Sequence, residues 1–264
     1  MTRFSKKTSN RKGFTILEIL MAVGLTFIVI MGVYLAYQLS SSSMGSGERK
    51  MEVQQNIRAA LDFMTREIRG IGKGLPIQIP NRFRILEANS SRISFLAADG
   101  NRLVATLTSP AGAGSTTISV SSSSEISGND MVCIVGGSMG EINVVSSISG
   151  TNITLKYELL NGYPSGAGIY KLENPSRIAY GIDLAEGQLT RGSDGDLRGN
   201  IRGGMQPVVD GVSNLSFQYY DSGGSELGPL PLDDNSRDLI RRIKVSMTIG
   251  GYKLSSDIKP RNLF

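Results

Sequence analysis

Hydrophobic residues follow three different patterns along this chain of 264 residues. Residues 19–37 are mostly apolar and contain no charged side chain, which is typical of a helix with apolar surroundings on every side. Between residues 53 and 71, apolar side chains recur every three or four positions, which predicts an amphipathic helix. Beyond Pro76, short β-rich runs alternate with Gly, Ser, Asn and Asp, which predicts antiparallel strands.

The first of these segments is long enough to cross a membrane. Residues 14–37 would form a helix of roughly 36 Å at about 1.5 Å per residue, against a hydrocarbon core of about 30 Å. The serines that follow contain no Ala-x-Ala motif, so we expect an anchor and not a cleaved signal peptide. Five basic residues and no acid precede the segment, which predicts a single span with a cytoplasmic N-terminus and an external body.

The second helix has a stripe of apolar residues that we expect to pack on a sheet. Before the stripe, the serines and glycines of residues 40–47 are poor helix formers and predict a loosened or interrupted helix. After it, three glycines and Pro76 predict the end of the helix. The stripe consists of Val53, Ile57, Leu61, Met64, Ile68 and Ile71.

The remaining pattern predicts an α+β fold, in which a long N-terminal helix packs on an antiparallel β-rich head. The helix is transmembrane in its first half (14–39) and amphipathic in its second (40–74), and the head covers residues 75–264. Residues 109–172, rich in Ser, Gly and Thr, are expected to be an insertion, either a small β-subdomain or an elaborated hairpin. Strands are predicted at 82–86, 92–97, 102–107, 116–120, 131–135, 142–145, 153–157, 168–172, 177–182, 188–191, 215–220, 240–249 and 253–258.

Composition removes several classes of chemistry. The chain has no His, no Trp and a single Cys, so catalytic histidines, multi-thiolate zinc sites and internal disulfides are excluded. Cys133 lies in an apolar run and is expected to be a buried, inert thiol. No nucleophile elbow or phosphate-binding loop is present either. We therefore expect a protein that is not an enzyme, with no catalytic residues, no cofactor and no metal.

The positive net charge of +5 is confined to the N-terminal tip. The five basic residues before residue 14 account for all of it, because the remaining 23 basic side chains equal the 23 acidic ones. A neutral body argues against direct binding of nucleic acid, which needs an excess of basic side chains.

Two acidic loops could offer oxygen ligands to a cation. The first contains Asp194 and Asp196, and the second contains Asp233, Asp234 and Asp238. Calcium needs six to eight convergent oxygens, and neither loop has the EF-hand pattern. Solvated turns, in which Asp is common, are the expected explanation for both.

Glu18 is the unusual residue of the apolar segment. A carboxylate without a partner at bilayer depth costs about 2.5–3.5 kcal/mol. Glu18 could lie at the interface, near the helix N-terminus whose dipole favours an anion. Alternatively, it could pair with a cation such as a free α-amino group, which is mostly charged at neutral pH.

The residues around Glu18 resemble a known signal. A basic leader followed by GFTILEI at residues 13–19 is similar to the class III signal of type IV prepilins and type II secretion pseudopilins. The resemblance implies that residues 1–13 are a leader, that prepilin peptidase cleaves between Gly13 and Phe14, and that Phe14 is N-methylated. It also implies that Glu18 meets the Phe14 amine of a neighbouring subunit. Unlike most major pilins, the second half of the span has no proline.

A second stretch narrows the resemblance. Residues 54–69 resemble the helix of PilW-type minor pilins and of the related J-type pseudopilins, and residues 208–221 and 243–263 show weaker similarity in the same order. The resemblance implies a pilin fold and a minor pilin that helps to initiate or cap type IV pilus assembly. Its partners would be prepilin peptidase and other minor and major pilins. It would reside in the inner membrane, with a periplasmic head, and then at the pilus tip. A J-type pseudopilin of a type II secretion system and a membrane-anchored adhesin or binding protein are the alternatives.

Overall fold

The computed structural model describes residues 15–193 and 204–263, excluding the side chains of residues 41–49. The chain divides into two compact units, Met1–Glu52 and Val53–Phe264, which we describe separately. Helix α1 (Ile16–Arg69) contributes to both units. The predictions for Gly13, for Phe14 and for the loop with Asp194 and Asp196 concern residues outside the described ranges.

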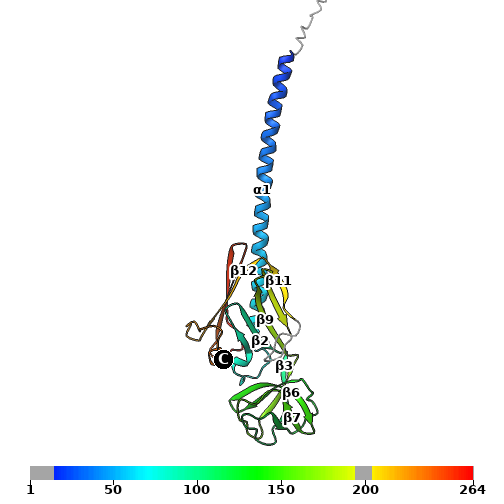
Figure 1. Ribbon diagram of the computed structural model, residues 1–264, viewed down its shortest axis with the longest axis vertical. Helices are drawn as coiled ribbons and strands as arrows, with labels where there is room; N and C mark the ends of the chain where they lie inside the picture. The colour runs from blue at the N-terminus through cyan, green and yellow to red at the C-terminus, as the bar shows by residue number, and fades with distance from the viewer. Residues whose placement is uncertain (1–14, 194–203, 264) are drawn as a thin grey trace, which may run out of the picture. The chain divides into compact units, whose positions relative to one another are not determined.

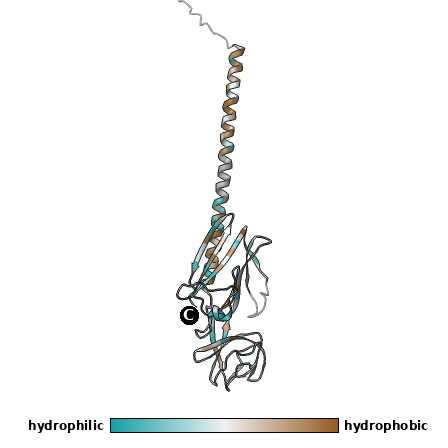
Figure 2. Cartoon of the chain, turned by 60° about the vertical axis from the view of Figure 1, so that its left-hand side comes forward, coloured by the Kyte–Doolittle hydropathy of each residue, from teal (hydrophilic) through white to brown (hydrophobic). Residues whose placement is uncertain are grey.

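The first unit is built on an apolar helical surface. Residues Ile16–Ser40 of α1, 25 in number, are long and apolar enough to cross a membrane, and all of their side chains are exposed. Figure 2 shows hydrophobic colour around this part of the helix. A membrane anchor and a signal sequence both have these properties.

The prediction of an interruption at residues 40–47 is wrong, because the backbone is helical throughout that stretch. Low helix propensity is a weak preference, of about 0.5–1 kcal/mol per residue for Ser and Gly. Extending a helix that already exists adds a hydrogen bond for each residue fixed, and avoids a new nucleation step. The helical segments on both sides thus allow the helix to continue through the serines and glycines.

In the second unit, the predicted apolar stripe lies in the core. Ile57, Met64 and Ile68 have no exposed surface, and Val53 is partly buried against the same cluster. The stripe packs on the five-stranded and three-stranded sheets described below, so the predicted α+β fold with a helix packed on sheet is confirmed.

The helix ends at Arg69, five residues before the predicted bound of 74, because the run of glycines begins there. Gly72 and Gly74 adopt positive φ angles of 70° and 74°, a conformation that favours glycine. A Cβ atom on Gly74 would lie 2.5 Å from the carbonyl oxygen of Ala98. The turn after α1 therefore depends on glycine for both its backbone conformation and its close approach to the sheet.

Two antiparallel sheets pack around the second half of α1. The five-stranded sheet has the order β1-β2-β9-β10-β11, and the three-stranded sheet has the order β12-β13-β14. Their strands are β1 (Ile85–Ala88), β2 (Arg92–Ala97), β9 (Ser176–Asp183), β10 (Gln188–Ser193), β11 (Gln206–Asp210), β12 (Val212–Tyr220), β13 (Arg242–Ile249) and β14 (Tyr252–Ile258).

A third sheet, of six strands, is formed entirely by residues 100–173, a longer range than the 109–172 expected from composition. Its order is β3-β8-β5-β6-β7-β4, and β6 and β7 are labelled in the green module of Figure 1. Hydrogen bonds from Thr108 N to Ser119 O and from Ser121 N to Thr106 O, both 2.9 Å, join the ends of the two edge strands. The sheet thus closes on itself. Its strands are β3 (Gly100–Thr106), β4 (Thr117–Ser119), β5 (Met131–Gly136), β6 (Met139–Ser149), β7 (Asn152–Leu155) and β8 (Gly168–Glu173).

Each part of the second unit has its own hydrophobic core. One core joins α1 to the five- and three-stranded sheets, and a second fills the closed six-stranded sheet. A third cluster connects the two parts. In it, Leu75, Ile79 and Leu96, from the part that contains α1, contact Cys133 and Ile142 of the six-stranded sheet. The six-stranded module is therefore attached to the rest of the head through buried apolar contacts as well as through the chain.

The structure corrects the prediction of a strand over residues 82–86. Its first half forms a short helix, α2 (Asn81–Arg84), and the strand β1 begins at Ile85. Pro80 begins this turn: the Phe83 backbone nitrogen donates to the Pro80 carbonyl at 3.1 Å, and the buried Arg84 side chain binds backbone carbonyls at the end of the turn. The structure also adds strand β11 and the short helix α3 (Asp234–Asp238), which the hydrophobic pattern did not indicate.

Candidate functional site: the start of the apolar helix

The first turn of α1 is closed by a reciprocal hydrogen-bond arrangement between Thr15 and Glu18. The Glu18 Oε2 atom accepts from the Thr15 backbone nitrogen at 2.9 Å and from its hydroxyl at 3.0 Å. In return, the Glu18 backbone nitrogen donates to the Thr15 hydroxyl at 3.3 Å. This is a capping box, in which a Thr and a Glu three residues later satisfy otherwise free backbone N–H groups.

The capping box explains where the one acid of the apolar segment lies. Glu18 is the only charged residue described between Thr15 and Tyr37, and it is held at the positive end of the helix dipole. Its second oxygen, Oε1, makes no hydrogen bond within the described residues.

Polar side chains further along the apolar surface are satisfied within the helix. The Thr26 hydroxyl donates to the carbonyl of Ala22 at 2.7 Å, and the Gln38 amide donates to the Tyr34 hydroxyl at 2.9 Å. Such internal bonds let a polar side chain remain in surroundings that offer no water. The surface from Ile19 onward therefore suits lipid or a bundle of other apolar helices.

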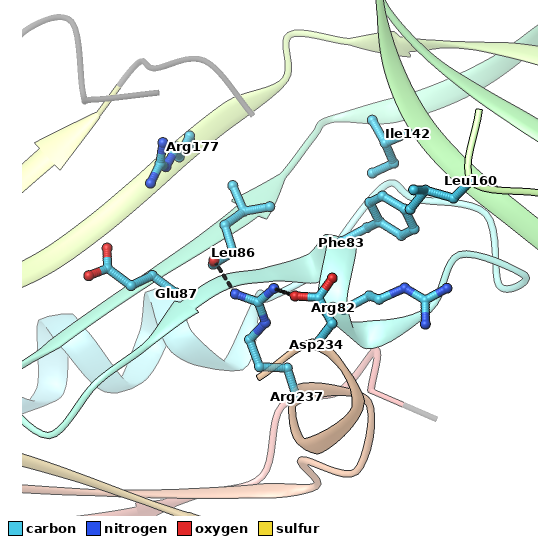
Figure 3. A pocket seen from close by; sticks show the side chains of 9 residues that line it. All are labelled: Arg82, Phe83, Leu86, Glu87, Ile142, Leu160, Arg177, Asp234 and Arg237. Carbon is cyan, nitrogen blue, oxygen red and sulfur yellow. Dashed lines mark hydrogen bonds and ion pairs between the residues drawn. The ribbon is translucent and has the colours of Figure 1, made fainter. Parts of the chain in front are cut away.

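A second candidate is the pocket of about 460 Å³ shown in Figure 3. It lies between the six-stranded module and the part of the head that contains α2, β1 and α3. Its arginines are engaged by neighbouring groups. Arg82 binds Asp238 through two bonds, from its backbone nitrogen at 2.7 Å and from Nη1 at 2.9 Å. Arg237 donates to the Leu86 carbonyl and to Asp234. The pocket thus contains neutralised ion pairs and no arrangement of a nucleophile with a base.

The predicted acidic loop at residues 233–238 has structural roles. Asp233 is the N-cap of α3 and accepts from the Ser236 backbone nitrogen at 2.8 Å, and its hydrogen bonds with Ser236 lower its pKa. Asp234 pairs with Arg237, and Asp238 pairs with Arg82. Within the described residues, no group of three potential ligands could hold a metal ion.

Sequence reasoning missed a polar cluster on the second half of α1. Glu67 accepts from Arg191 and from the hydroxyl of Tyr180, both on the five-stranded sheet. Burial and the bond to Glu67 raise the pKa of Tyr180, and the same carboxylate raises the pKa of Arg191. The signal was present, because Glu67 is three residues after Met64 and four before Ile71, on the buried face.

The single cysteine is confirmed as a buried thiol. Cys133 lies on β5 with no exposed surface, and burial raises its pKa well above the usual range. A thiol that stays protonated is a poor nucleophile.

Comparisons with known proteins identify no family for this chain. The sequence matches no model of a protein family and no curated protein. Among solved structures, a segment resembles part of three phage tailspikes. The tailspike gp54 of Acinetobacter baumannii bacteriophage AP22, in complex with the capsular saccharide, is 21% identical with a TM-score of 0.26 over 28% of this chain and 15% of that one.

Two further phage tailspikes show a similarly low structural similarity to this chain. The gp61 tailspike of Pseudomonas phage phi297 is 19% identical with a TM-score of 0.25, over 27% of this chain and 14% of that one. The gp49 tailspike of Pseudomonas phage LKA1 is 27% identical with a TM-score of 0.25, over 28% and 15%. This chain therefore aligns with about a seventh of the length of each tailspike.

Proposed function

We propose that this protein is a minor pilin that helps to initiate or cap a type IV pilus. The observation that carries the proposal is the capping box, which fixes the Glu18 carboxylate at the tip of an exposed apolar helix, directly after Gly13 and Phe14 in the chain. Cleavage by prepilin peptidase between these two residues would create a new amine on Phe14, which is then N-methylated. No catalytic residue or cofactor of its own is required.

The assembly step follows from the charge of Glu18. Thr15 satisfies one carboxylate oxygen within the chain, and Oε1, which has no hydrogen bond from the described residues, would accept from the Phe14 amine of a neighbouring subunit. An amine is mostly charged at neutral pH, so the pair removes two unpaired charges from apolar surroundings. A subunit in a different register leaves both charges without a partner. Pairing thereby selects the correct register of the incoming helix.

The apolar helix provides both the membrane anchor and the assembly surface. Before assembly, residues 14–39 would hold the protein in the inner membrane, with the N-terminus cytoplasmic and the head periplasmic. During assembly the same surface would leave the lipid and pack against the helices of other minor and major pilins. The head, with its added six-stranded module, is large, which favours a position at the tip over repeated stacking along the shaft.

The test compares two acids on α1. Glu18→Ala removes the proposed assembly carboxylate, whereas Glu52→Ala removes an exposed acid beyond the apolar segment. Both proteins should reach the membrane at wild-type levels. We expect the Glu18 variant to be absent from sheared fibres and the Glu52 variant to be present. Recovery of Glu18→Ala in fibres at wild-type levels would favour a membrane-anchored binding protein whose head acts alone.

A further inference from the structure

A basic groove lies where the end of α1 meets β14 and the C-terminal segment. It has a volume of about 700 Å³. Its basic residues are Arg66, Arg69, Lys73 and Arg261, and its one acidic residue is Asp62. The lining thus has an excess of three positive charges, although the chain beyond residue 13 has equal numbers of acidic and basic side chains.

The arginines of this groove differ from most others in the head. Arginines elsewhere are bound to protein groups, for example Arg82 to Asp238 and Arg191 to Glu67. Arg66, Arg69 and Arg261 make no ion pair and no side-chain hydrogen bond with another described residue. All three side chains are exposed at one groove.

The preference of helix ends for basic residues explains two of these four cations. The last turn of a helix favours basic residues because its free carbonyls carry partial negative charge, and this accounts for Arg66 and Arg69. Lys73 follows the helix, and Arg261 comes from the C-terminal segment almost two hundred residues later in the chain. Lys73 has only a long contact with Asp99, of 3.8 Å between exposed groups. The fold therefore collects cations from separate segments at one place.

The frame of the groove is fixed by bonds that do not involve these charged ends. The Thr65 hydroxyl lies 3.0 Å from that of Ser256, which joins α1 to β14. The backbone nitrogen of Arg261 donates to Arg69 O at 3.1 Å, and the Asn262 amide donates to Ile71 O at 3.0 Å. The groove is thus held open by the fold, and a ligand need not order its backbone.

We propose that this groove binds an acidic segment of another protein. Guanidinium groups match carboxylates in two-point hydrogen bonds, and the hydroxyls of Thr65 and Ser256 supply polar groups beside them. No aromatic residue lines the groove, so nucleic acid bases have nothing to stack on. The neutral body also lacks the extended positive field that a long polyanion requires.

The test uses the full-length protein in a neutral detergent and a fluorescein-labelled hexaglutamate peptide, with binding followed by fluorescence anisotropy. The groove variant carries Arg66→Gln, Arg69→Gln and Arg261→Gln. The control carries Arg58→Gln, Lys50→Gln and Lys253→Gln, which remove the same charge from exposed positions outside the groove. Equal thermal unfolding midpoints for the three proteins establish that each variant is folded.

We expect the groove variant to bind the peptide about tenfold more weakly than the wild type, and the control to bind within about twofold of it. Raising the salt concentration from about 50 to about 300 mM should weaken wild-type binding, because exposed ion pairs are screened. Equal weakening of both variants, or no binding by the wild type, would overturn the proposal. So would tighter, groove-dependent binding of a DNA duplex. Because the measurement uses isolated protein, it does not depend on whether the chain enters a fibre.

Discussion

Glu67 of α1 and Arg191 of β10 form a two-point ion pair that joins the helix to the five-stranded sheet. Arg191 Nε donates to Glu67 Oε2 at 2.9 Å, and Nη2 donates to Oε1 at 2.8 Å. The Arg191 guanidinium also lies 5.8 Å from the centre of the Phe63 ring. Parallel bonds of this kind restrict both distance and orientation. The pair therefore sets the position of the helix along the sheet, in addition to the apolar stripe.

Removing one partner of this pair should destabilise the head. Arg191→Met leaves the half-buried Glu67 carboxylate with only Tyr180 as a partner, and we expect a loss of about 1–3 kcal/mol in the free energy of unfolding. Glu67→Gln with Arg191→Met should lose less than the sum of the two single changes, because the residues are coupled. Tyrosine fluorescence during denaturant unfolding measures this. Additive losses would mean that the pair contributes no coupling.

Arg84 is a fully buried cation that donates hydrogen bonds to five backbone carbonyl groups. Its five N–H donors bind the carbonyls of Gly72, Pro76, Ile77, Ile79 and Asn262, at 2.7–3.3 Å. Burial lowers its pKa to about 10, so it stays charged at neutral pH. The side chain thus fastens the turn after α1 to the C-terminal segment.

Substitution of Arg84 should be among the most damaging changes in the head. Arg84→Met keeps most of the volume but leaves the carbonyls without donors, and we expect a loss of about 3–5 kcal/mol in the free energy of unfolding. Arg84→Lys keeps the charge but has too few donors for five carbonyls. It should be intermediate when both variants are unfolded in denaturant. A loss below about 1 kcal/mol for Arg84→Met would contradict the role assigned to this residue.

Glu141 gives the six-stranded module a predictable dependence on pH. It is buried, and its Oε2 accepts from the backbone nitrogens of Leu160 and Asn161 at 3.0 and 3.1 Å. Burial raises the pKa of the carboxyl above its ordinary value of 4.5, and these hydrogen bonds offset the increase only in part. The folded state therefore holds this proton more tightly than the unfolded state does.

The sign of the effect follows from that difference. As pH rises from about 4.5 through the raised pKa, the free energy of unfolding should fall, because the folded protein must ionise a buried group. Glu141→Gln keeps an oxygen acceptor and removes the titration. Denaturant unfolding at a series of pH values should show the wild type losing stability relative to this variant over that range. Parallel profiles would show that Glu141 does not titrate differently in the folded state.

Elements whose pattern and burial coincide could be predicted from the sequence. The spacing of Ile57, Met64 and Ile68 placed them on one face, and all three are buried. Strand β2 was predicted with its observed bounds, because an apolar run lies between turn-forming residues. Strand β11 has no such alternation and contains Pro207, so only its pairing with β10 defines it.

Long-range polar contacts could not be predicted. Arg84 binds Asn262, which is 178 residues away, and no local pattern distinguishes a buried arginine from a surface one. Only one of the two residues of the candidate site could be predicted from the sequence. Glu18 is conspicuous as an acid in an apolar segment, whereas the role of Thr15 is seen only in the hydrogen bonds of the structure. The groove cations come from segments that only the folded chain brings together.

The most direct test of the proposed function is mass spectrometry of the N-terminus of the protein isolated from membranes and from fibres. If the chain is a processed pilin, the mature protein begins at Phe14, carries one methyl group on its α-nitrogen and lacks residues 1–13. A Glu18→Ala protein should show the same cleavage, since the carboxylate acts in assembly. An intact N-terminus that begins at Met1, or cleavage beyond the apolar segment, would contradict the account.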